Sequence, residues 1–169
     1  MIIVKEIFET IVSGMTFDSN AINFKFGYWA IVANELLTDG KSPSLASQRF
    51  PLIFLHAEFD EEHTDYRTLR INPIIYIITQ TETNYDIDKR FEFIYKPILY
   101  PIYLDLLTKM RQSQKFWIKP PEILHTKKDL FYLQNKTATQ NNLMQIVDAI
   151  EIKFNQLDLI KSNCYYKSI

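Results

Sequence analysis

Two long apolar segments flank a short acidic run, and this arrangement constrains the fold more than any other feature of the sequence. The first segment, residues 51–59, is apolar on both faces at its start, and one face turns polar from His56 onward. The second segment, residues 66–79, alternates as a strand does. Its side chains on one face are Leu69, Ile71, Ile75 and Ile77. The pattern predicts a long β-hairpin with a charged tip at residues 60–65, interrupted near Pro73, which cannot donate a ladder hydrogen bond.

Two other segments have apolar side chains at the three- or four-residue spacing of an amphipathic helix. Residues 2–12 form one such stripe, followed by a serine–glycine pair where a helix would end. A longer run begins after Asp86, a residue type that caps helices. Pro97 and Pro101 lie inside this run. Because each proline removes a backbone hydrogen bond and crowds the carbonyl four residues earlier, this helix should kink or restart there.

The rest of the chain predicts strands and loops. Alternation from Ile22 predicts a strand that β-forming residues continue to Val32, and turn residues predict a loop at 38–44. Beyond two adjacent prolines we expect a short strand at 129–133, a polar loop at 134–142 and a last strand at 146–158. Neither βαβ alternation nor an internal repeat is visible. The predicted fold is a single α+β domain, residues 1–169, whose mainly antiparallel sheet packs against an N-terminal helix and a kinked central helix.

Composition excludes several functions. Loops that bind phosphate need clustered glycines, but Gly14, Gly27 and Gly40 stand far apart. The 19 basic and 20 acidic residues give a net charge of −1, which argues against simple nucleic-acid or membrane-surface binding. A single cysteine, Cys164, rules out an internal disulfide and a multi-thiolate zinc site. No run reaches the roughly 20 apolar residues of a membrane helix, and the N-terminus lacks the pattern of a signal peptide, so we expect an unexported chain.

Candidate catalytic chemistry is sparse. His56 and Glu58 are two apart on a predicted strand and so share a face, with His63 and Asp65 nearby in the acidic run. Histidine and carboxylate can hold a divalent cation when three ligands come close together. The other interpretation is a hydrogen-bonded histidine beside a solvated hairpin tip, and we favour it because short matches of this kind are often false. Cys164 has no histidine near it in sequence. We therefore predict no catalytic residue, metal or cofactor, and no enzyme activity.

An aromatic cluster lies in the predicted central helix. Its members are Phe91, Phe93, Tyr95, Tyr100 and Tyr103. Most have the spacing of a buried helix face, but rings at these positions occupy more than one side of a helix, so some must face outward. Exposed aromatic side chains tend to mark interfaces. The cluster therefore indicates a binding surface.

Several of these segments also support a family resemblance when their order and spacing are taken together. They are residues 50–55, 74–81 and 90–103, with 116–117, 125–127 and 147–152 fitting the same pattern later in the chain. As a set they resemble the tail-terminator and head–tail connector proteins of tailed bacteriophages. The likeness is nearest to the neck or ring proteins of crAss-like phages of Bacteroidetes.

The resemblance implies a structural virion protein, assembled in the host cytoplasm, that forms a ring in the neck through which the genome passes. The implied partners are further copies of the chain and the neighbouring neck, portal or tail proteins, with DNA passing without specific binding and with no membrane. Ring assembly needs a heterologous interface, and an acidic lumen would repel DNA phosphates. The residues we expect at the interface or the lumen are Asp60, Glu61, Glu62, Asp65, Tyr100 and Tyr103.

Two other functions stay open at this point. The first is a small metal-dependent enzyme that uses His56, Glu58 and His63. The second is an adaptor or inhibitor, encoded by a phage or a mobile element, that binds a host protein through its outward aromatic side chains. Both could be separated from a neck protein by the neighbouring genes, since portal, capsid and tail genes would favour the neck.

Overall fold

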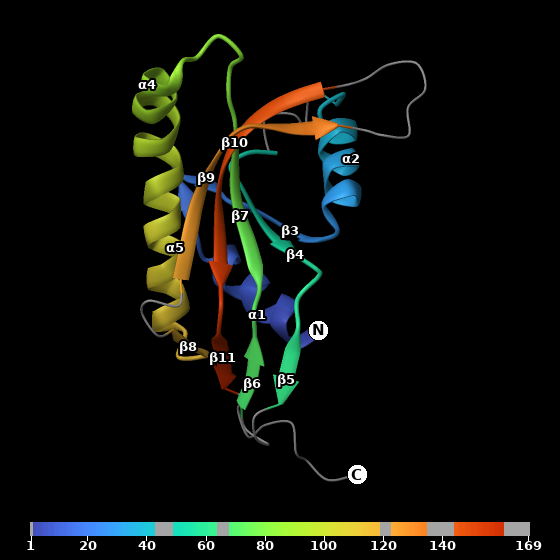
Figure 1. Ribbon diagram of the computed structural model, residues 1–169, viewed down its shortest axis with the longest axis vertical. Helices are drawn as coiled ribbons and strands as arrows, with labels where there is room; N and C mark the ends of the chain where they lie inside the picture. Colours follow the sequence, from blue (N-terminus) through green and yellow to red (C-terminus); the bar gives the residue numbers. More distant parts are fainter. Residues whose placement is uncertain (1, 43–48, 64–67, 119–122, 135–143, 161–169) are drawn as a thin grey trace.

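The computed structural model describes residues 2–42, 49–63, 68–118, 123–134 and 144–160. The helices are α1 (Ile2–Ser13), α2 (Trp29–Asp39), α4 (Ile87–Arg90), the π-helix η1 (Phe91–Leu99) and α5 (Tyr100–Gln112), and the last three follow one another directly (Figure 1). The strands are β1 (Thr16–Phe17), β2 (Asn20–Ala21), β3 (Asn23–Gly27), β4 (Leu52–His56), β5 (Glu61–His63), β6 (Thr68–Ile71), β7 (Ile74–Gln80), β8 (Phe116–Ile118), β9 (Ile123–Gln134), β10 (Met144–Phe154) and β11 (Leu157–Ile160).

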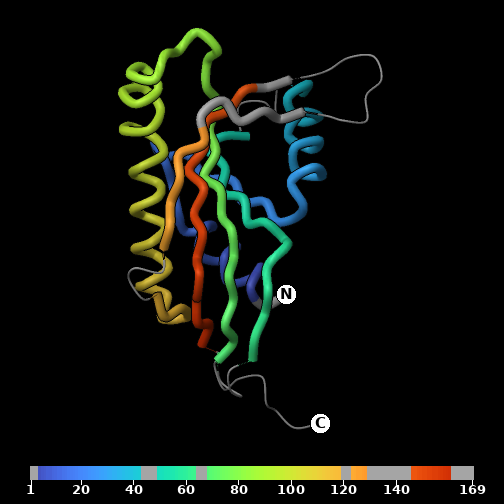
Figure 2. The backbone as a smooth tube through the Cα atoms, viewed as in Figure 1, coloured from blue at the N-terminus to red at the C-terminus, as the bar shows by residue number. Residues whose placement is uncertain are grey.

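Two sheets lie end to end along the long axis of the molecule (Figure 2). The upper sheet has the strand order β3-β4-β7-β10-β9, and the lower sheet has the order β5-β6-β11-β8. Along the chain, the described strands change sheets five times: from β4 to β5, β6 to β7, β7 to β8, β8 to β9 and β10 to β11. The predicted α+β class with a mainly antiparallel sheet is confirmed.

Helices cover the two faces of the sheets unequally. On one face, α1 and the continuous helix α4–η1–α5 bury the main core, in which Phe8 and Leu106 pack with Ile53. On the other face, α2 covers part of the upper sheet, and Leu36 packs with Phe54 in a smaller core. Neighbouring residues of β4 thus enter different cores because side chains alternate along a strand. This explains why residues 51–55 read as apolar on both faces.

The predicted hairpin is confirmed. β4 pairs with β7, and β5 pairs with β6, both antiparallel. The strand is interrupted between β6 and β7 at Asn72 and Pro73, as the proline predicts. The carbonyl of Pro73 still accepts a hydrogen bond from the N–H of Phe154, at 3.2 Å. The N-terminal helix is confirmed as well, with Val4, Phe8 and Val12 buried along its predicted stripe.

The prediction of one strand from residue 22 to residue 32 is wrong. β3 ends at Gly27, and α2 begins at Trp29. The apolar residues of this helix recur at helical spacing, and packing against the sheet outweighs the β-propensity of Ile31 and Val32. α2 also connects β3 to β4, which are parallel neighbours, so the chain contains one βαβ unit that the sequence did not reveal.

Other predicted boundaries are corrected too. Residues 61–63 of the acidic run form β5, because backbone pairing with β6 leaves their side chains in solvent. α2 extends into the predicted 38–44 loop. The short strand expected at 129–133 belongs to β9, which begins at Ile123, and the last strand is divided into β10 and β11. Residues 135–142 of the expected polar loop lie outside the described residues.

The two prolines in the central helix are accommodated by a change of helix type. Pro97 lies inside the π-helix η1, and at its end the N–H of Tyr100 donates to the carbonyl of Tyr95, five residues earlier. The wider turn directs the preceding carbonyls away from the proline ring. Pro101 then falls in the first turn of α5. Leu99 and Tyr100 keep right-handed helical backbone angles, so the helix continues without the predicted restart and changes only from π- to α-helix there.

Candidate assembly surface

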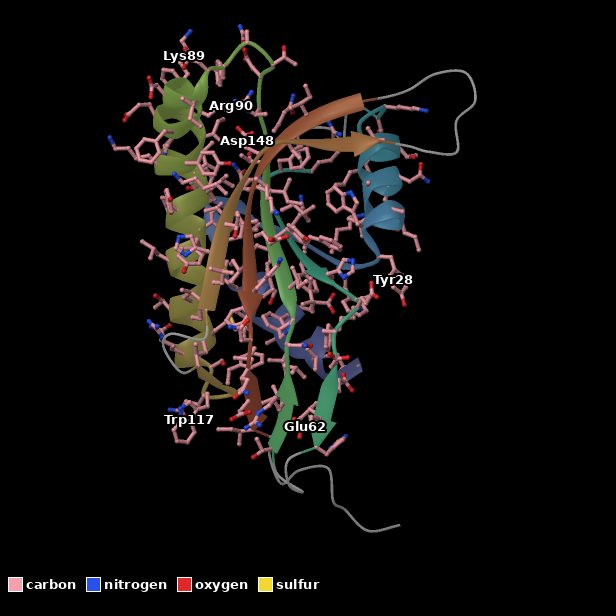
Figure 3. All side chains as sticks on the ribbon, viewed as in Figure 1. Tyr28, Glu62, Lys89, Arg90, Trp117 and Asp148 are labelled. Atoms are coloured by element: carbon pink, nitrogen blue, oxygen red, sulfur yellow. The ribbon has the colours of Figure 1, made fainter. Side chains whose placement is uncertain are left out.

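The two edges of the lower sheet differ in charge: acidic residues lie on and before β5, whereas basic residues precede β8, which itself has no charged side chain. Four exposed acidic residues lie along β5 and the segment that leads into it; this β5 edge consists of Glu58, Asp60, Glu61 and Glu62. The opposite β8 edge consists of Arg111, Lys115, Trp117 and Ile160. Figure 3 shows the labelled Glu62 and Trp117 on opposite sides of the lower sheet.

Hydrogen bonds fix the backbone of the β5 edge. The N–H of Asp60 donates to Oδ1 of Asn72 at 2.7 Å, and Nδ2 of Asn72 donates to Oδ2 of Asp60 at 3.1 Å. Glu62, whose side chain is 70% exposed, lies 4.0 Å from a guanidinium nitrogen of Arg70. Asp65, also expected at an interface or lumen, lies outside the described residues. The described acidic side chains thus stand on an ordered strand with most of their charge in solvent.

The β8 edge combines positive charge with apolar surface. Along β8, Phe116 is buried in the core, whereas Trp117 on the other face is 62% exposed. Arg111 and Lys115 flank this strand, and in the described part of the chain neither forms an ion pair. An open pocket of about 360 Å³ lies here, lined by Arg111, Gln114, Phe116, Trp117, Ile118 and Ile160.

The two tyrosines expected at an interface occupy different positions. Tyr103 is only 8% exposed, and its hydroxyl lies 3.4 Å from Nδ1 of His125 on β9. Burial raises the pKa of the Tyr103 hydroxyl. Tyr100 is half-buried. Among the other residues of the aromatic cluster, Phe93 is the most exposed, at 57%.

Three rings of the aromatic cluster surround one lysine of the outer strand β9. Nζ of Lys127 lies 5.0 Å from the ring centre of Phe91, 5.4 Å from that of Tyr95 and 5.8 Å from that of Tyr100. These are cation–π distances. Beside them is a pocket of about 420 Å³ whose lining includes Asp88. These contacts therefore connect β9, at the edge of the upper sheet, to η1 and α5.

The histidine and carboxylate residues weighed as a metal site do not come together. Nδ1 of His56 accepts the backbone N–H of Glu58 at 3.3 Å, and the His56 ring meets Tyr28 edge-on at 6.3 Å. His63 lies on β5. Within the described residues, no group of three or more histidine, cysteine or acidic side chains is placed to hold a metal ion. Asp65 and Cys164 lie outside those residues.

Sequence reasoning missed two polar clusters inside the sheet. Arg90 and Asp148, both buried, form an ion pair of 2.6 Å (Figure 3). On the other face, the hydroxyl of Tyr76 donates to Glu151 at 2.8 Å. Glu151 also meets the ammonium groups of two lysines, Lys128 at 3.4 Å and Lys153 at 3.2 Å. The available signal was the presence of two acids in the otherwise apolar run of β10.

The charge of Glu151 follows from these contacts. Burial by itself would raise the pKa of its carboxyl group, but the hydrogen bonds from Tyr76 and Lys153 and the positive charges of Lys128 and Lys153 hold that pKa below its ordinary value. Conversely, burial and the hydrogen bond to Glu151 raise the pKa of Tyr76. The cluster is thus a neutral tyrosine and an ionised carboxylate that stabilise one another.

Comparisons with known proteins give no family. A scan against protein-family models finds no match, and a search of curated protein sequences finds no relative. Among the described helices, none is long and apolar enough to span a membrane.

Proposed function

We propose that this protein is a structural subunit of a tailed-phage virion, and that copies of it assemble into a ring of the head–tail connector. The observation that carries the proposal is the lower sheet: β5 and β8 end the order of its described strands, and the side chains of β5 and of Trp117 on β8 are exposed. Unpaired sheet edges are the surfaces through which chains add strands from a neighbour. A subunit that has one such edge on each side can contact two neighbours.

The resemblance to neck and tail-terminator proteins supplies the biological setting. It rests on segments that form the framework of the fold, including β4, β7 and the helix from Arg90 to Tyr103. These segments place the long hairpin beside the continuous helix. Such a role is mechanical: it requires a rigid subunit with shaped edges, and no chemistry at a catalytic group.

The proposal is tested in virions. Particles of the phage that encodes this chain are purified, their proteins are identified by mass spectrometry, and the neck is reconstructed by cryo-electron microscopy. We expect the chain among the virion proteins and its density as a ring between portal and tail. Virions that lack the protein would overturn the proposal, and its recovery from infected cells in a complex with a host protein would favour the adaptor instead.

A further inference from the structure

The order and direction of the strands in the lower sheet allow a copy of the chain to extend the sheet of another copy. Each neighbouring pair, β5 with β6, β6 with β11 and β11 with β8, is antiparallel. With four alternating strands, β5 and β8 run in opposite directions. A second copy placed alongside with the same end up therefore brings its β5 antiparallel to β8 of the first copy. This pairing continues the alternation without turning either molecule over.

Charge favours the same arrangement. The β5 edge presents Glu58, Asp60, Glu61 and Glu62, while the β8 edge presents Arg111 and Lys115. Within the described residues, Glu58, Arg111 and Lys115 form no ion pair in their own chain. Two β5 edges or two β8 edges would repel each other, whereas one of each attract. Electrostatic complementarity of this kind selects the partner and the orientation.

Apolar surface is concentrated on one of the two edges. Trp117 and Ile160 are exposed large side chains, at 62% and 44%, and they line the open pocket at the β8 edge. Exposed tryptophan and arginine side chains are typical anchors of protein interfaces. A neighbouring strand laid along β8 would lie next to Trp117, and Ile160 lies one strand further in, on β11. The β8 edge thus has the composition of an interface centre, and the β5 edge has that of its acidic counterpart.

We infer that copies of this chain associate head to tail, with the β5 edge of one copy against the β8 edge of the next, so that the lower sheet continues from subunit to subunit. This inference rests on the proposed function and specifies the contact that would build the ring. A heterologous contact leaves one edge free at each end of every assembly, so the series grows until it closes on itself.

The inference is tested with purified full-length protein by sedimentation velocity and mass photometry over a concentration series. Two double variants each change one edge: Glu58→Lys with Glu61→Lys neutralises the β5 edge, because Asp60 and Glu62 remain, and Arg111→Glu with Lys115→Glu reverses the charge of the β8 edge. An equimolar mixture of the two double variants is measured as well. The control, Lys41→Glu with Lys89→Glu, changes the net charge as much as the second variant but in the turn after α2 and in α4, away from both edges. Circular dichroism verifies that each variant folds.

We expect the unaltered chain and the control to form a series of oligomers larger than a dimer. Either double variant alone should be monomeric, because its two edges no longer carry opposite net charges. An equimolar mixture of the two double variants should associate again, because the basic β8 edge of the first variant meets the acidic β5 edge of the second. Association of the unaltered chain should also weaken at high salt, since the charges are exposed.

Three results would overturn the inference: an unaltered chain that stays monomeric throughout the series, double variants that still associate, or a mixture of the two folded double variants that does not. These outcomes are independent of the virion experiment. A ring in the neck together with double variants that still associate would retain the proposed function and reject this contact. If the protein is absent from virions but its oligomers depend on the charges of the two edges, the contact is retained and the proposed function is rejected.

Discussion

The guanidinium of Arg90 lies 2.6 Å from the carboxylate of Asp148, and both side chains are buried, at 3% and 0% exposure. The first residue ends the short helix α4, and the second lies on β10. Arg90 also donates to Oγ1 of Thr81 and to the carbonyls of Glu82 and Tyr85. One side chain thus joins the start of the central helix, the segment after β7 and the centre of the upper sheet.

This arrangement predicts that removing one of the two charges lowers the free energy of unfolding far more than removing both. Asp148→Ala leaves a guanidinium buried without its counter-charge, and we expect it to lower the free energy of unfolding by about 3–5 kcal/mol. Arg90→Met combined with Asp148→Leu should recover most of that loss, because apolar side chains of similar volume need no counter-charge. Urea unfolding measures all three proteins.

A surface ion pair of similar length provides the control. Nε of Arg70 lies 3.0 Å from Oδ1 of Asp158, but the Arg70 side chain is 32% exposed. Asp158→Ala should therefore cost about 1 kcal/mol or less. Equal losses for Asp148→Ala and Asp158→Ala would contradict the importance of burial.

The start of the central helix gives a second prediction. Oδ1 of Asp86 accepts the backbone N–H of Lys89 at 2.9 Å, which confirms the helix cap expected from sequence. Asp86→Ala should lower the free energy of unfolding by about 1 kcal/mol, since a helix N–H loses its partner. Asp88→Ala, in the same turn, is the matched control and should cost less, because the structure gives Asp88 no capping hydrogen bond. Thermal unfolding of the two variants compares them directly, and a larger effect of Asp88→Ala would be inconsistent with the cap.

Local patterns in the sequence account for the elements that were predicted correctly. The stripe of α1, the alternation along the hairpin strands and the cap at Asp86 each depend on residues that lie close together in the sequence. Pro73 interrupts its strand for the same kind of local reason, because it lacks a backbone donor. Such signals survive folding when tertiary packing agrees with them.

The features that were missed depend on distant residues. Ile31 and Val32 have high β-propensity and so favour a strand, whereas the burial of Val32 against the apolar sheet face makes the helical spacing decisive. Arg90 and Asp148 are 58 residues apart, and no pattern in one sequence links them. The opposed β5 and β8 edges likewise depend on strand order, which places two segments with no common pattern at the two sides of one sheet.

The depressed pKa of Glu151 predicts a sensitivity to acid. A carboxyl group whose pKa is lower in the folded than in the unfolded chain adds stability above the unfolded value, and this stability is lost as the pH falls through the folded value. Tyr76→Phe removes one of the hydrogen bonds that lower this pKa. The pKa of Glu151 should therefore rise toward its ordinary value of 4.5, and acid unfolding should begin at higher pH.

Carboxyl chemical shifts followed by NMR during a pH titration measure that change. Tyr103→Phe is the control, because the Tyr103 hydroxyl lies near His125 rather than a carboxylate. It should leave the titration of Glu151 unchanged. An unaltered Glu151 titration in Tyr76→Phe would show that the lysines alone keep the carboxylate ionised.

Lys127, an exposed residue within cation–π distance of Phe91, Tyr95 and Tyr100, predicts a stabilising role for its charge at the outer strand β9. Lys127→Gln keeps most of the side-chain length but removes the cation, and we expect a loss of about 0.5–1 kcal/mol in the free energy of unfolding. Lys127→Arg should retain most of the stability, because a guanidinium also interacts with aromatic faces. Lys96→Gln is the matched control: its ammonium pairs with Glu92 on the exposed helix surface at 3.2 Å, where an i,i+4 pair contributes little. Urea unfolding ranks the three variants, and hydrogen exchange of the β9 amides locates the effect. Equal rates of β9 amide hydrogen exchange in Lys127→Gln and in the unaltered chain would mean that the contact between this charge and the rings does not stabilise β9.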